Sequence, residues 1–81
     1  MKTFSEMKID ISNIYIFKTN VRTEFDRLRV KNVLDASRKI LQWSIDMEDV
    51  DCVLRVVSDS LNPGQIISVL DYVGYECTEL E

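Results

Sequence analysis

The feature that most constrains the fold is a strict two-residue alternation over positions 41–48. Every second residue there is apolar, and the residues between are polar or acidic. The four apolar positions are Leu41, Trp43, Ile45 and Met47. A period of two predicts a strand over 40–47 with one buried face. After a short acidic turn, an apolar and β-branched run predicts a second strand over 52–57, and so short a turn predicts that the two strands pair as a hairpin.

The segment before this hairpin predicts a strand followed by a helix. Residues 14–21 are rich in β-branched and aromatic side chains, and the first four are apolar on both faces, which is typical of a central strand. Residues 24–38 show the stripe of an amphipathic helix. We expect its buried side to contain Phe25, Leu28, Val30, Val33 and Leu34, continued by Ile40 or Leu41.

The segment after the hairpin predicts a second helix and a last strand. Asn62 is suited to cap the helix, with Pro63 in its first turn, where the missing N–H costs nothing. The predicted buried stripe consists of Ile66, Ile67, Leu70 and Val73. Gly74 is suited to the left-handed conformation that ends helices, and strand residues follow over 75–80.

The predicted order of elements is therefore β-α-β-β-α-β. With right-handed crossovers, it gives an α+β ferredoxin-like sandwich: a four-stranded antiparallel sheet of order 4-1-3-2 with both helices on one face. We expect one domain over 13–81, preceded by a tail or lead-in over 1–12. In this arrangement the junction at Thr23, the hairpin around Asp49 and the turn at Tyr75 meet at one end of the sheet.

Composition and charge argue against several classes of protein. The net charge of −4 argues against general nucleic-acid binding. No apolar run approaches the roughly 18 residues of a membrane span, and the polar start lacks a signal-peptide core, so we expect no membrane insertion and a cytoplasmic location. The chain has no histidine, phosphate loop or nucleophile beside a base, so we expect neither enzymatic activity nor a cofactor.

The cysteines and the acidic turn are weaker candidates for a site. Cys52 and Cys77 match no metal-ligand spacing, and we expect free thiols buried as small apolar residues, on strands separated by the first one. The acidic residues over 46–51 lack the glycine and the ligand pattern of a calcium loop, which favours a solvated hairpin.

The junction between the first strand and the first helix carries two residues with capping spacing. Thr23 and Asp26 lie three positions apart, so each side chain can accept a hydrogen bond from the backbone N–H of the other. The positive end of the helix dipole also favours an acidic residue there. We predict a capping box.

Several segments of the chain resemble the heavy-metal-associated domain of copper chaperones and metal-pumping ATPases. The resemblance runs from about Ile14 to Leu80. It is carried by core and turn positions, namely Phe17–Val21, Val30–Leu34, Trp43–Asp46, Val53–Val56 and Gly74-Tyr75. It implies the ferredoxin-like fold and a binding loop after the first strand.

Members of that family bind Cu(I) or other soft metals through a Cys-x-x-Cys pair in this loop, because soft metals prefer sulfur. The two cysteine positions fall on Thr23 and Asp26, so the metal motif is absent and we expect no metal ligand. Tyr75 matches a family position close to the loop, and we expect it to pack over Val21. The resemblance also implies a basic surface that faces acidic partner domains. The candidate partner surface here consists of Arg22, Arg27, Arg29, Lys31 and Tyr75.

Two main functional hypotheses follow. The first is a non-enzymatic, heavy-metal-associated-like module of metal homeostasis that has lost its metal. Such a module would bind an acidic protein or form a homodimer. The homodimer would use the open sheet face or the edge of the 40–47 strand. The second is a small-molecule-sensing regulatory domain, since the Asn62-Pro63-Gly64 helix start mildly favours an anion. A metal chaperone with a non-standard site is a further alternative.

Overall fold

The computed structural model describes residues 14–80 and contains two helices and four strands within that range. The tail or lead-in predicted over 1–12 lies outside the described residues. The elements in chain order are β2 (Ile14–Thr19), α1 (Glu24–Ala36), β3 (Gln42–Asp46), β4 (Val53–Val57), α2 (Pro63–Tyr72) and β5 (Cys77–Glu79). Each predicted element is present, and no end differs from its predicted position by more than two residues.

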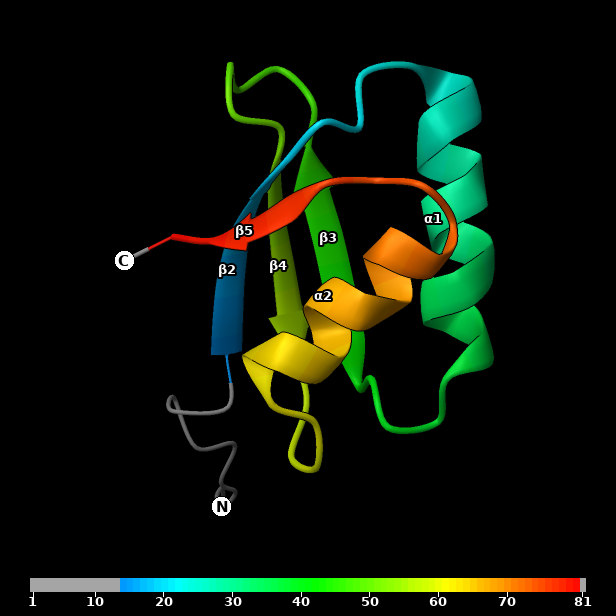
Figure 1. Ribbon diagram of the computed structural model, residues 1–81, viewed down its shortest axis with the longest axis vertical. Helices are drawn as coiled ribbons and strands as arrows, with labels where there is room; N and C mark the ends of the chain where they lie inside the picture. Colours follow the sequence, from blue (N-terminus) through cyan, green and yellow to red (C-terminus); the bar gives the residue numbers. More distant parts are fainter. Residues whose placement is uncertain (1–13, 81) are drawn as a thin grey trace, which may run out of the picture.

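The strands form one antiparallel sheet of order β3-β4-β2-β5, which confirms the predicted order 4-1-3-2 read from the other edge. β3 and β4 pair as the predicted hairpin, with Ile45 opposite Leu54. β2 is central, between β4 and β5, as its two-sided apolar pattern required. Figure 1 shows the β3–β4 turn and the β2–α1 loop together at the top of the sheet.

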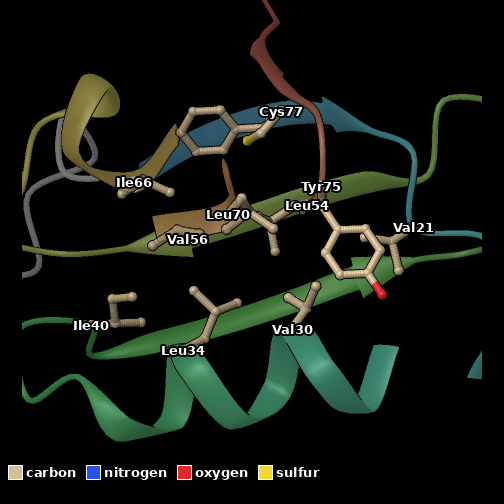
Figure 2. Packing of buried hydrophobic residues seen from close by; sticks show 11 residues of the cluster. Val21, Val30, Leu34, Ile40, Leu54, Val56, Ile66, Leu70, Tyr75 and Cys77 are labelled. Atoms are coloured by element: carbon tan, nitrogen blue, oxygen red, sulfur yellow. The ribbon is translucent and has the colours of Figure 1, made fainter. Parts of the chain in front are cut away.

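The core lies between the sheet and the two helices (Figure 2). Phe17 and Leu54 from the central strands are fully buried, as are Leu34 of α1 and Leu70 of α2. Both helices therefore cover the same face of the sheet. This position sets the first turn of α1 beside Val21 and the α2–β5 turn, where the candidate site lies.

The predicted buried stripe of α1 is wrong at its N-terminal end. Val30 and Leu34 are fully buried, but Phe25 is 68% exposed and Leu28 is 45% exposed. At 100° per residue, Phe25 and Leu28 lie about 140° and 160° around the helix from Val30, so they face away from the core. Leu41, which was also expected inside, precedes β3 and is 55% exposed.

The second face of the sheet is open to solvent and partly apolar. Ile14 and Ile16 of β2 lie on it, 40% and 36% exposed, beside Val57 and Arg55 of β4. In the described part of the chain, neither helix has the length and apolar character needed to cross a bilayer.

Candidate functional site

The loop between β2 and α1 is fixed at both sides by hydrogen bonds. The Thr19 hydroxyl donates to the carbonyl of Cys52 at 2.7 Å, which ties the end of β2 to the start of β4. Asn20 Oδ1 accepts from the backbone N–H of Glu76 at 2.9 Å, which ties the loop to the segment before β5. Val21, between these anchors and the helix, is fully buried. Contacts with the start of β4, with the segment before β5 and with the core thus fix the loop in place.

The predicted capping box is confirmed at the start of α1. Thr23 Oγ1 accepts from the backbone N–H of Asp26 at 3.0 Å, and Asp26 Oδ2 accepts from the backbone N–H of Thr23 at 3.2 Å. The same Oδ2 accepts from the N–H of Arg22, also at 3.2 Å. One carboxylate oxygen therefore satisfies two backbone donors at the positive end of the helix dipole.

The second oxygen of Asp26 makes a contact that the sequence analysis missed. Tyr75 donates its hydroxyl hydrogen to Asp26 Oδ1 at 2.7 Å, across 49 residues of chain. The Tyr75 ring is buried and lies beside Val21, as predicted (Figure 2). One signal was present in the sequence: Asp26 lies only about 40° around α1 from Val30, on the inward side of the helix.

These contacts shift the pKa of both partners. The hydrogen bond from Tyr75, followed by the backbone N–H of Arg22, lowers the pKa of the Asp26 carboxyl. Burial, followed by the bond to Asp26, raises the pKa of the Tyr75 phenol. At neutral pH the pair is therefore a carboxylate and a neutral phenol, the charge states that this hydrogen bond requires.

Arg29 is an exposed residue that contacts Tyr75, the partner of Asp26. Its guanidinium lies 5.7 Å from the centre of the Tyr75 ring and 5.9 Å from that of Phe25, within the range of cation–π attraction. It also donates to the carbonyl of Val73 at 3.2 Å, near the end of α2. Of the predicted basic residues, Arg29 is the one most closely integrated with the site.

The other predicted basic residues occupy different surroundings. Arg27 pairs with Glu24 within the first turn of α1, at 3.1 Å. Lys31 pairs with Asp35 at 2.6 Å, and the other oxygen of Asp35 accepts from Trp43 Nε1, so Lys31 belongs to the β3 side of the helix. Arg22 is exposed in the loop itself. The structure thus places Arg22, Arg27 and Arg29 around the loop, and separates Lys31 from it.

The residues at this loop do not fit a soft-metal ion. Thr23 offers a neutral hydroxyl and Asp26 a hard oxygen, and the side chains of both already serve as hydrogen-bond acceptors. Within residues 14–80, no group of three or more histidine, cysteine or acidic side chains is placed to hold a metal ion.

The two cysteines do not replace the missing ligands. Both are buried and free, as predicted. Thr19 pairs with Cys77 on one side and bonds to the Cys52 carbonyl on the other, so the two cysteines are separated by about two strand spacings, or roughly 10 Å. Burial raises the pKa of the Cys77 thiol to about 12, which keeps it protonated at neutral pH.

The helix start at Asn62 is also closed by its own residues. Asn62 Oδ1 accepts from the N–H of Gln65, and Gln65 Oε1 accepts from the N–H of Asn62, both at 2.9 Å. This capping box confirms Asn62 as the cap, and Gly74 takes the predicted left-handed conformation after α2, at φ 93°. The capping box leaves fewer free N–H groups for an anion than the sequence alone indicated.

The lowered pKa of Asp26 predicts a specific acid sensitivity. The carboxylate contributes stability above the unfolded pKa of about 3.8 and loses it as the pH falls through the lower folded value. In urea titrations between about pH 5 and pH 2, Asp26→Asn should therefore lose less stability on acidification than the wild-type domain. The control is Asp59→Asn in the β4–α2 loop, which lies at the opposite end of the sheet (Figure 1). The stability of this variant should change with pH as that of the wild-type domain does. Parallel pH profiles for all three proteins would contradict the assignment.

The fold is shared with metal-binding domains of known structure. The solution structure of the N-terminal domain of ZntA in its Zn(II) form is similar, with a TM-score of 0.69 and 19% identity, over 84% of this chain and 92% of that one. The yeast copper transporter domain Ccc2a, solved in apo and Cu(I)-loaded states, matches with a TM-score of 0.71 and 16% identity, over 84% of this chain and 94% of that one. No protein-family model and no curated protein sequence matches the chain. At these identities the likeness establishes a heavy-metal-associated, ferredoxin-like fold.

Proposed function

We propose that this domain is a non-enzymatic, heavy-metal-associated-like module that has lost soft-metal binding and works in metal homeostasis by binding another protein. The observation that carries the proposal is the double engagement of Asp26. One carboxylate oxygen closes the capping box with Thr23, and the other accepts the Tyr75 hydroxyl. The two positions that correspond to metal-binding cysteines in the resembled family thus stabilise the loop instead.

The surface around this loop supports a role in protein binding. Phe25 and Leu28 are large apolar residues on the outer side of α1, 68% and 45% exposed. Arg29 lies about 40° around α1 from Phe25, and Arg22 is exposed in the preceding loop. Exposed apolar side chains surrounded by arginines are typical of interfaces, and the positive charge favours an acidic partner surface.

An anaerobic titration with Cu(I), in the presence of a competing soft-metal chelator, tests the proposal. The domain is expected to leave the Cu(I) with the chelator, because the loop offers no thiolate. Retention of one equivalent against the chelator would overturn the loss of the site and favour the third hypothesis, a chaperone with non-standard ligands. Zn(II), the ion in the ZntA structure, should be titrated in parallel.

One observation favours the alternative of a small-molecule sensor. A depression of about 220 Å³ lies on the open sheet face, between Ile14 and Val57 on one side and Gln42 and Ser44 on the other, with Arg55 in its lining. It is smaller than most ligand pockets, which measure roughly 300–1,000 Å³. A thermal-shift screen over a metabolite panel tests this function, and an unchanged melting temperature throughout counts against it.

A further inference from the structure

The end of the domain that carries the loop has two surfaces of opposite charge. The first surface, here called the basic patch, consists of Arg22, Phe25 and Arg29 at the start of α1. The second, the acidic tip, is the β3–β4 turn, which contains Glu48, Asp49, Val50 and Asp51. Between positions 18 and 31 there are five basic and two acidic residues, whereas positions 46 to 51 contain four acidic residues and no basic one.

Each surface also contains an exposed apolar residue. Val50 at the acidic tip is 84% exposed, and Phe25 in the basic patch is 68% exposed. Neither belongs to the buried core or to the partly buried side chains packed against it. Apolar contacts framed by complementary charges are the composition expected of a protein interface.

The β3–β4 turn and the start of α1 both lie at the top of Figure 1, with the β2–α1 loop between them. They are held in a fixed relation, because the backbone N–H of Thr19 donates to the carbonyl of Asp51 at 3.0 Å and Lys18 lies 3.8 Å from the Asp51 carboxylate. A two-fold axis at this end can place two copies so that unlike surfaces face each other. The acidic tip of one copy then faces the basic patch of the other, twice, and the contact closes.

We infer that the partner of this surface is a second copy of the same chain, in a head-to-head two-fold dimer in which Val50 of each copy contacts Phe25 of the other. This inference rests on the proposed function, because the acidic tip of the second copy serves as the acidic partner surface. The contact involves one turn and one helix end per copy, so it is smaller than a standard interface and the dimer is weak. Its charges are exposed, so the dimer is salt-sensitive.

Sedimentation equilibrium of the purified chain at two ionic strengths tests the dimer. A concentration-dependent mass between monomer and dimer is expected at about 0.01 M salt, where the Debye length is about 30 Å. The dissociation constant should rise about tenfold or more at about 0.15 M, where that length is about 8 Å. A monomer at all concentrations in low salt would overturn the inference.

A charge exchange identifies the surfaces. Arg22→Glu and Asp49→Lys, each alone, should abolish self-association, because both contacts of the homodimer then bring like charges together. An equimolar mixture of the two variants should recover it, since both contacts of the mixed dimer pair opposite charges. Asp59→Lys is a matched control at the opposite end of the sheet and should dimerise like wild type.

The outcomes are separable from those of the proposed function. Far-UV circular dichroism and thermal unfolding verify that each variant is folded. Wild-type-like dimerisation of Arg22→Glu, or a mixture that stays monomeric, would overturn the head-to-head contact. Neither result bears on metal retention, which the Cu(I) titration measures independently.

Discussion

Replacing Thr23 and Asp26 together by cysteine is expected to create a soft-metal site in the loop between β2 and α1. The loop would then present two thiols at the start of α1, where the helix dipole lowers thiol pKa values and stabilises thiolates. One equivalent of Cu(I) should stay with the variant during anaerobic titration against a chelator that strips the wild-type domain. The gain should exceed a hundredfold in apparent affinity, about 2.7 kcal/mol or more.

The same variant should show opposite stability changes without and with metal. Loss of the capping box costs about 1 kcal/mol, and loss of the Asp26–Tyr75 bond adds a similar amount, so the apo variant should unfold at lower urea concentration than wild type. At a free Cu(I) concentration about a thousandfold above the dissociation constant, binding adds about 4 kcal/mol and reverses the order.

The control for this experiment is the double variant Thr23→Ser and Asp26→Glu. It keeps a hydroxyl and a carboxylate at capping-box spacing but offers no sulfur, so it should neither bind Cu(I) nor gain stability from it. Equal Cu(I) retention by the control, or no retention by the cysteine variant, would show that these two positions are not the equivalents of the family's metal ligands.

Truncating Leu54 to alanine is expected to remove a large part of the stability of the domain. Leu54 is fully buried on β4, opposite Phe17 on one side and Ile45 on the other. Leu→Ala substitutions at such sites cost about 2–5 kcal/mol. A domain of this length is stable by only about 4–12 kcal/mol, so the variant should unfold at a much lower urea concentration.

Leu28→Ala is the matched control, because it removes the same atoms from a side chain that is 45% exposed. Its unfolding free energy should stay within about 0.5 kcal/mol of wild type. The comparison also tests the correction to α1: if Leu28 were part of the buried stripe, its truncation would cost as much as that of Leu54. Equilibrium urea unfolding followed by Trp43 fluorescence measures both variants.

The parts of the fold that the sequence predicted depend on local patterns. The alternation over 41–48 and the short turn predicted the hairpin, and the residues at the helix starts predicted the capping box of Thr23 and Asp26 and the N-cap at Asn62. The two-sided apolar run at Ile14–Phe17 predicted a central strand, and this placement together with right-handed crossovers gave the sheet order. Each of these signals spans fewer than ten residues.

The parts that it did not predict depend on contacts distant along the chain or on which side of a helix faces the sheet. The predicted stripe of α1 combined residues on two sides of the helix, and only the docked helix shows that Val30 faces inward and Phe25 outward. The bond between Tyr75 and Asp26 joins positions 49 residues apart. No local period reports such a pair, and the angle of about 40° between Asp26 and Val30 on α1 places Asp26 inward only once Val30 is known to face the sheet.

The buried thiols of Cys52 and Cys77 can serve as native probes of conformational opening. Cys52 directly precedes β4 and Cys77 begins the edge strand β5, on either side of β2, and no disulfide joins them. A thiol reagent reaches them only when the sheet edges separate or the domain unfolds, so labelling kinetics measure how often each side of the sheet opens. The native sequence therefore provides two separate thiol probes of opening, one on each side of the central strand.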